Sequence, residues 1–220
     1  MVDNAVRYGF RPVRSRAGGT AFPVVERAFC ISGASFDVNG GAANVSLRPG
    51  DPIVRLTSGA VNLAPGSEGT EDDVLGIVIG IEQYFDANTG RMTASGPGVP
   101  SDIAYGTNLE RQTVIKYIPA ESAVFAIQVD DIVTATTLAA YQLLIGLNCQ
   151  HILSGASGAT AAAPKLDISG AAATATFDWR IQGISTSTQN VDPAGANFEL
   201  YVTCNRPQLF TGATTMWLGI

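Results

Sequence analysis

The chain has 220 residues, of which 15% are charged and 46% hydrophobic, with a net charge of −6 and a mean hydropathy of +0.19. This composition excludes an intrinsically disordered chain, which could not bury enough apolar surface, and the length allows one sizeable core or two small lobes. The acidic balance also argues against a nucleic-acid-binding protein, because such proteins need a basic surface.

The start of the chain differs in charge from the rest. Residues 1–16 carry a net charge of +3, whereas the remainder carries −9. Residues 1–20 follow neither the helical nor the strand period, and they contain Gly9 and Pro12, which disfavour both structures. We therefore expect residues 1–20 to form an extended arm that adds little to the protein's own core.

Short strands separated by turns are expected over residues 21–133. The nearly continuous apolar run within 72–85 is typical of a strand buried on both faces. A hairpin is expected around residues 88–90, where Asn-Thr-Gly follows that run. The segment 113–131 predicts two further strands around a turn at Pro119.

One helix is expected at the start of the C-terminal part, residues 134–220. Its N-terminal cap is expected between Asp131 and Thr134, and Gly146 can end it. The apolar residues at helical spacing are Leu138, Tyr141, Leu144 and Ile145. Three or four more strands are expected to follow.

These patterns predict a mainly β fold, a barrel or sandwich of short strands with one short helix and an extended N-terminal arm. We expect a barrel-like lobe over 21–133 and a helix plus β-rich lobe over 134–220. No linker-like composition separates the two, so they should pack as one body.

Chemistry-bearing motifs are sparse, and we expect no catalytic, cofactor or metal site. His151 is the only histidine, and Cys149 alone would be a poor zinc partner for it. The acidic clusters at 71–73 and 130–131 are better explained as a solvated loop and a helix cap than as a catalytic pair. No phosphate-binding loop and no nucleophile elbow occurs in the sequence.

Three cysteines without CxxC spacing, Cys30, Cys149 and Cys204, suggest reduced thiols and synthesis in the cytoplasm. No signal peptide is expected, because no apolar stretch follows the first charges. The longest apolar runs are too short to span a bilayer, so we expect no membrane partner.

Several stretches resemble the head decoration (capsid cement) proteins of tailed bacteriophages. The resemblance lies in GFRPVRSRAGG, RPGDPIVRL, VLGIVIGIEQYFD and YIPAESAVFAIQVDD, spread over roughly residues 1–132, and is weaker in the C-terminal third. These are strand and turn patterns that carry no catalytic signature.

The resemblance implies a non-enzymatic viral structural protein that binds the outside of the capsid and stabilises it. Its partners would be the major capsid protein and its own copies, as a homotrimer or alternatively a dimer. It would reside on the exterior of the virion after synthesis in the host bacterial cytoplasm. The arm would act as a clamp on acidic capsid groups, and its expected contact residues are Arg7, Tyr8, Phe10, Arg11, Arg14 and Arg16.

Two other functions remain open from the residues. One is another virion component, such as a minor tail or head–tail joining protein. The other is a carbohydrate-binding β-sandwich, which would need a row of exposed aromatic side chains such as Tyr84, Phe85 and Tyr105.

Overall fold

The structure is a computed structural model, and every structural statement below concerns the residues that it describes. These are 9–16, 25–30, 49–55, 61–64, 66, 73–86, 91–94, 113–130, 135–153, 163–173, 177–187, 190, 192–194 and 198–207. Over these ranges the fold is mainly β, with antiparallel sheets and one short helix, as the sequence predicts.

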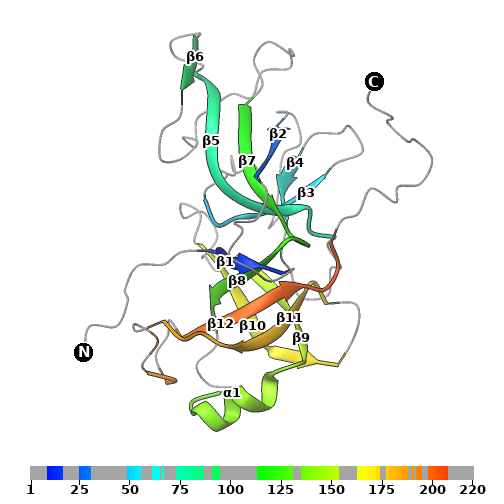
Figure 1. Cartoon of the computed structure of the whole chain (residues 1–220), viewed down its shortest axis with the longest axis vertical. Helices are drawn as coiled ribbons and strands as arrows, with labels where there is room; N and C mark the ends of the chain where they lie inside the picture. Colours follow the sequence, from blue (N-terminus) through cyan, green and yellow to red (C-terminus); the bar gives the residue numbers. More distant parts are fainter. Residues whose placement is uncertain are drawn as a thin grey trace, which may run out of the picture.

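Sheet A forms the lower half of the molecule in Figure 1. Its six strands, in spatial order, are β1 (Arg11–Ser15), β8 (Ala123–Gln128), β12 (Glu199–Cys204), β11 (Trp179–Ile184), β9 (Asn148–Leu153) and β10 (Pro164–Ala172). A bridge between Val129 and Leu166 brings the far strand β10 back to the end of β8. The amide of Asp130 also donates to the carbonyl of Leu166 at 3.0 Å. The sheet therefore curls into a half-barrel.

Sheet B lies above sheet A in Figure 1. Its strands, in spatial order, are β2 (Glu26–Cys30), β7 (Thr113–Pro119), β5 (Gly76–Asp86), β3 (Pro52–Arg55) and β4 (Val61–Leu63), and β6 (Arg91–Ala94) pairs with the end of β5. The register between β5 and β7 shifts twice. Such irregularities bend a strand, and β5 is visibly curved in Figure 1.

Two local predictions are confirmed in sheet B. Ile77 and Val78 are both 0% exposed, and consecutive residues of a strand point to opposite faces, so β5 begins buried on both faces. The antiparallel pairing of Asp86 with Arg91 matches the expected hairpin. Its turn residues, 87–90, lie outside the described part of the chain.

The two sheets share one core, but they divide the chain at a different place from the expected boundary. Ile77 and Ile118 of sheet B belong to the same buried cluster as Phe125 and Trp179 of sheet A. After β1 the chain runs through sheet B, and it returns to sheet A in the turn at residues 120–122 rather than near residue 133. The reason is that β8 is buried along its whole length, which suits a strand inside sheet A.

The prediction of a separate arm is wrong for residues 9–16. Strand β1 pairs with β8 in sheet A, and Phe10 is 2% exposed in the shared core. The amide of Phe10 donates to the carbonyl of Gly50 at 2.9 Å. The approach is so close that a Cβ added to Gly9 would lie 2.3 Å from the Gly50 oxygen. Residues 1–8 and 17–20 of the expected arm lie outside the described ranges.

The predicted helix is present as α1 (Leu138–Leu144), but its cap lies later than expected. The side chain of Thr137, rather than a residue between 131 and 134, accepts from the amide of Ala140 at 3.2 Å. Gly146 follows the helix with φ of +92°, a conformation that favours glycine and ends helices. Tyr141 is the buried residue of the helix.

Replacing Phe10 with alanine should destabilise the fold strongly. Truncation of a buried phenylalanine removes apolar contacts and leaves a cavity, so we expect the free energy of unfolding to fall by about 3–5 kcal/mol. Val13→Ala, three residues later on β1 and exposed, should change it by no more than about 0.5 kcal/mol. Urea unfolding followed by tryptophan fluorescence measures both. Equal stability of Phe10→Ala and the parent would contradict a core role for this segment.

Candidate partner-binding face

Strand β1 places two arginines on the outward face of sheet A. In the register with β8, Arg11 pairs with Ala126 and Arg14 pairs with Val124. Residues three apart in a regular strand would point to opposite faces. The register shift makes Val13 an extra residue, a β-bulge that returns Arg14 to the side of Arg11.

A third arginine lies on the same face, on β11. Arg180 is exposed between the buried Trp179 and Ile181, and it pairs with Thr203 of β12. Thr203 lies on the same face of β12 as Tyr201, because the two are two residues apart. Tyr201 pairs with Ala126 of β8, and Ala126 pairs with Arg11. Arg180 and Arg11 therefore lie on the same face of sheet A.

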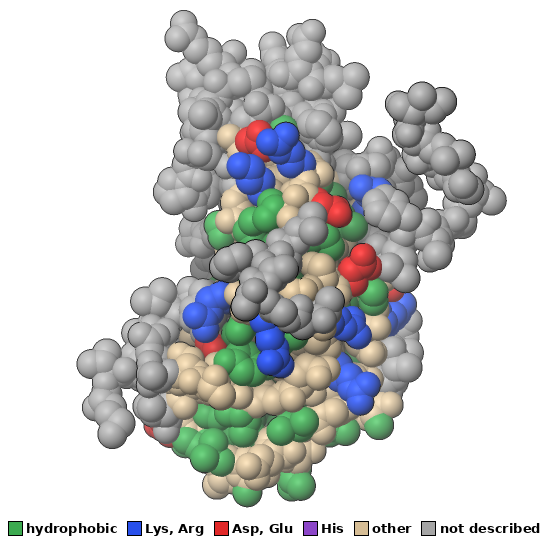
Figure 2. All heavy atoms as spheres, in the orientation of Figure 1, with side chains coloured by type: hydrophobic (Ala, Val, Ile, Leu, Met, Phe, Trp, Pro, Cys, Tyr) green, Lys and Arg blue, Asp and Glu red, His purple; other side chains and the backbone are tan. Residues whose placement is uncertain are grey.

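We call the surface formed by Arg11, Arg14 and Arg180, with Arg16 just after β1, the arginine face. All four residues are exposed. Figure 2 shows Lys and Arg side chains, in blue, spread over the half of the molecule that contains sheet A. The guanidinium of Arg16 donates to the carbonyl of Cys204 at 3.3 Å, which holds this side chain against the sheet.

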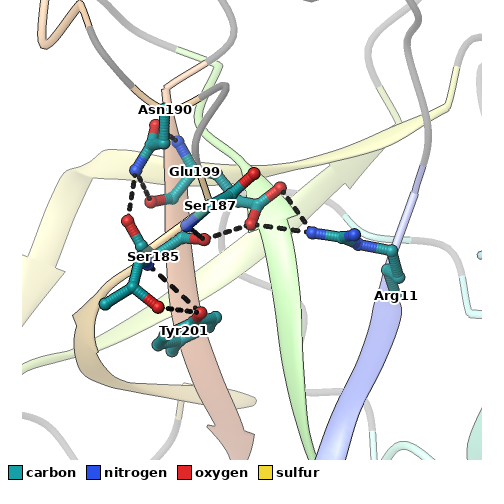
Figure 3. A network of polar contacts seen from close by, with 7 residues as sticks. Arg11, Ser185, Ser187, Asn190, Glu199 and Tyr201 are labelled. Carbon is teal, nitrogen blue, oxygen red and sulfur yellow. Dashed lines mark hydrogen bonds and ion pairs between the residues drawn. The ribbon is translucent and has the colours of Figure 1, made fainter.

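Arg11 is fixed by a buried carboxylate, as Figure 3 shows. Its Nη2 donates to both oxygens of Glu199, at 3.0 and 3.2 Å. Because β8 lies between β1 and β12, this contact ties the first strand to the last. The hydroxyl of Ser185 also donates to Oε1 of Glu199.

Asn190 lies in the connection between β11 and β12 and completes the network by bonding to backbone groups at both ends of that connection. Its side-chain amide donates to the carbonyls of Ser185 and Glu199 at 3.0 and 2.9 Å, and its Oδ1 accepts from the amide of Glu199 at 2.8 Å. The hydroxyl of Tyr201 accepts from the amide of Thr186 at 3.1 Å. These bonds satisfy backbone groups where the two strands separate, so the network holds Arg11 and the strand ends in place.

Burial dominates the electrostatics of Glu199. Its side chain is 5% exposed, whereas the side chain of Arg11 is 52% exposed. Burial raises the pKa of Glu199 from 4.5 to about 7, because a carboxylate is poorly solvated there. The ion pair with Arg11 favours the charged carboxylate and so opposes this rise in the pKa, but water around the half-exposed guanidinium weakens the ion pair.

Arg14 and Arg180 present their side chains to solvent. Within the described ranges, Arg14 and Arg180 have no ion-pair partner, in contrast to Arg11. Guanidinium groups form paired hydrogen bonds with carboxylates and phosphates. A face that presents several of them on one rigid sheet is suited to an acidic surface.

The structure alters the expected roles of the contact residues. Phe10 is wrong as a partner-facing anchor, because its side chain is buried against Trp179 of its own chain, with ring centroids 4.1 Å apart. Arg11 already binds Glu199. Arg14 and Arg16 are exposed as expected, while Arg7 and Tyr8 lie outside the described ranges.

His151 is a buried core residue, in agreement with a structural role. It is 0% exposed, and its Nδ1 accepts from the indole nitrogen of Trp179 at 3.3 Å. A carboxylate oxygen of Asp178 lies 3.4 Å from the same nitrogen. In the part of the chain that the structure describes, no group of three or more His, Cys, Asp or Glu residues could hold a metal ion.

Both described cysteine side chains are buried and free. Burial raises the pKa of Cys149 well above its usual value and that of Cys204 to about 12. These two residues behave as small apolar side chains, as expected for reduced thiols. The side chain of Cys30 is not among those described.

The other candidate residues are dispersed. Asp73 pairs with Arg206 at 3.0 Å, and the amide of Asp130 joins β10. The side chains of Tyr84 and Phe85 are not described, and residues 71, 72, 105 and 131 lie outside the described ranges, so an aromatic row and an acidic pair stay untested. No helix within the described ranges is long and apolar enough to cross a bilayer.

Sequence reasoning missed Arg180 and Glu199. The alternation in the segment Asp-Trp-Arg-Ile-Gln, with Trp179 and Ile181 apolar, already indicates that Arg180 points away from the core. Glu199 carries no comparable signal, because its role depends on an arginine 188 residues earlier in the chain.

Neutralising Glu199 should remove a pH-dependent part of the stability. Because folding raises the pKa of Glu199, the folded state binds a proton on this carboxyl group more tightly than the unfolded state does. The contribution of this group to the free energy of unfolding is therefore complete below about pH 4.5 and is lost as the pH rises through about 7. Relative to Glu199→Gln, the wild type should therefore lose on the order of 1 kcal/mol of unfolding free energy between pH 5 and 8, after allowance for screening by water.

Urea unfolding at several pH values measures this difference, and Glu121→Gln, which replaces an exposed carboxylate, serves as the control. A pH slope in Glu199→Gln identical to that of the wild type would contradict the assignment.

The chain matches no protein-family model, no curated protein and no solved structure. The resemblance to capsid cement proteins therefore stays a prediction from its own residues.

Proposed function

We propose that this protein is a non-enzymatic structural component of a tailed-bacteriophage virion, which binds the outer surface of the capsid and stabilises it. The single observation that carries the proposal is the arginine face. It presents exposed guanidinium groups together on one sheet in a chain whose net charge is −6. The resemblance over residues 1–132 supplies the kind of partner.

The binding would rely on a preorganised surface rather than on a flexible arm, at least for residues 9–16. Arg11 is held by Glu199 and Arg16 by the carbonyl of Cys204. Side chains that are already ordered lose less conformational entropy when a partner binds. The guanidinium groups of Arg14 and Arg180 would then pair with carboxylates of the capsid protein.

Repetition on the capsid lattice would strengthen modest contacts. Exposed ion pairs are individually worth about 0–1 kcal/mol, so a few arginines from one chain give weak binding. Copies joined as a homotrimer or a dimer would engage several equivalent capsid sites at once, which multiplies the affinity. The protein would be synthesised in the host cytoplasm and added to the exterior of the capsid.

Charge reversal on the arginine face should weaken capsid binding. We expect Arg14→Glu and Arg180→Glu each to lower the affinity for purified capsids of the source phage by about tenfold or more, because each replaces an attraction by a repulsion. Added salt should weaken wild-type binding as well. Co-sedimentation with capsids over a range of protein concentrations measures the affinity.

Arg27→Glu is the matched control. It makes the same change of charge on sheet B, where Arg27 pairs with Glu82 at 2.8 Å, and it should bind capsids as the wild type does. If all three variants bind equally well, the arginine face is not the contact. If the wild type does not bind capsids, the proposed function is wrong. The copy number per virion then distinguishes two alternatives. A connector would have six or twelve copies in a ring, whereas a protein outside the virion would have none.

A further inference from the structure

The ion pair between Arg11 and Glu199 joins an exposed cation to a buried anion. The side chain of Arg11 is 52% exposed, whereas that of Glu199 is 5% exposed. Nη2 of Arg11 lies 3.0 and 3.2 Å from the two carboxylate oxygens. A guanidinium group that is paired with a carboxylate of its own chain attracts a second carboxylate less strongly. While Glu199 is charged, Arg11 therefore contributes less to the arginine face than Arg14 or Arg180 does.

Glu199 can change its charge near neutral pH. Burial raises the pKa of Glu199 from 4.5 to about 7, because a buried carboxylate is poorly solvated. In the described part of the chain, two ionisable groups contact its network, Arg11 from β1 and Tyr201 on β12. Arg14 is farther along β1, opposite Val124. The other side chains around Glu199 are neutral: Gln128, its pair on β8, and Ser185, Ser187 and Asn190 of the β11–β12 connection.

The hydroxyl of Ser185 lets the network hold Glu199 in either charge state. This hydroxyl bonds to Oε1 of Glu199 and also reaches the hydroxyl of Tyr201. When Glu199 is charged, Ser185 donates to it. When Glu199 is protonated, its carboxyl O–H can donate to Oγ of Ser185, and the serine hydroxyl can turn to donate to Tyr201. Neither state leaves a buried donor without an acceptor, so Glu199 can take up a proton without disrupting the sheet.

Protonation of Glu199 should release only the side chain of Arg11, because other bonds hold the backbone on both sides. Strand β1 pairs with β8, and the preceding residue, Phe10, is buried in the shared core. The amide and the carbonyl of Glu199 bond to the side chain of Asn190 at 2.8 and 2.9 Å. Arg11 therefore stays on the arginine face when its ion pair with Glu199 is lost.

We propose that uptake of a proton by Glu199 releases Arg11 to bind the acidic partner, so that the arginine face binds more tightly in mildly acidic than in mildly alkaline solution. This inference rests on the proposed function for its partner, an acidic protein surface, and adds the regulation of the contact. The carboxylates of the partner keep their charge in mild acid, because an ordinary carboxyl group has a pKa of about 4. Binding of the partner and binding of the proton then favour each other.

The first test follows the charge of Glu199 in the full chain. NMR of isotope-labelled glutamate side chains between about pH 4 and about pH 9 gives their titration curves, and the resonance absent from Glu199→Gln belongs to Glu199. Its midpoint should lie near 7 and should rise in Arg11→Gln, because the charged carboxylate loses its cation. A wild-type midpoint near 4.5, or a midpoint that Arg11→Gln leaves unchanged, would overturn the proposal.

The second test measures binding to purified capsids by co-sedimentation. At about pH 8, Glu199→Gln, which resembles the protonated carboxyl group, should bind about threefold more tightly than the wild type, within the worth of one exposed ion pair. The wild type should gain about the same factor between about pH 8 and about pH 6, and Glu199→Gln should not. Arg11→Gln should remove both gains, because Arg11 is the group that is released.

Glu82→Gln is the matched control. Glu82 is also paired with an arginine, Arg27, at 2.8 Å, but on sheet B. This variant removes the same negative charge and should bind capsids as the wild type does. An equal gain in Glu82→Gln and Glu199→Gln would trace the effect to net charge and overturn the proposal. Weaker binding of Glu199→Gln at about pH 8 would also overturn it, because Glu199 would then order Arg11 for the partner instead of competing with it.

A hexaglutamate peptide separates this inference from the proposed function. If neither the wild type nor Glu199→Gln binds capsids at either pH, the proposed function is wrong, and the peptide then decides whether Glu199 controls Arg11. Its binding is measured by NMR titration of the full chain at about pH 8, where Glu199→Gln should bind the peptide more tightly than the wild type and Glu82→Gln should not. Equal affinities of the wild type and Glu199→Gln, or no binding by Glu199→Gln, would overturn the proposal.

Discussion

The position of Phe10 is the constraint on which the rest of the structure depends. Its ring stacks on Trp179 at 4.1 Å and meets Phe125 edge-on at 6.2 Å. With this side chain anchored in the shared core, the following residues must run along the free side of β8. The bulge at Val13 then sets Arg11 and Arg14 on one outward face. A single buried aromatic residue thus positions Arg11 and Arg14, the part of the arginine face that β1 supplies.

The sheet around Trp179 is arranged to accept that ring. Trp179 pairs with Cys149 on β9 and with Cys204 on β12, so two small side chains flank the large indole. Larger residues at these positions would compete for the space that Phe10 fills, since protein cores are close-packed. His151 accepts the hydrogen bond of the indole nitrogen, which would otherwise be buried without a partner.

Features with a local cause could be predicted from the sequence, and features that depend on distant partners could not. The apolar run of β5 and the helical spacing around Tyr141 are visible in short windows, and both elements formed as expected. The sequence predicts an arm over 9–16 because the segment follows neither period and contains Gly9 and Pro12, while the partners that make it a strand, at 123–126 and 179, are far away in the chain. The sequence likewise places the boundary between the two expected lobes near residue 133. It does not show that β8 belongs to sheet A, because the neighbours of β8 in that sheet, β1 and β12, are far from it in the chain. Of the four arginines expected at the site, Arg11, Arg14 and Arg16 are exposed as predicted, but the contact of Arg11 with Glu199 could not be predicted from its neighbours in the sequence.

The arginine face combines side chains of two kinds. Arg11 and Arg16 are held in place by contacts within the chain, the first by Glu199 and the second by the carbonyl of Cys204, whereas Arg14 and Arg180 have no ion-pair partner within the described ranges. The face is carried by β1 and β11, which belong to one sheet with β8 and β12 between them. The spacing of its guanidinium groups is therefore set by the fold before any partner binds. Several weak contacts that act together hold a protein on a repeating surface far better than any one of them does alone.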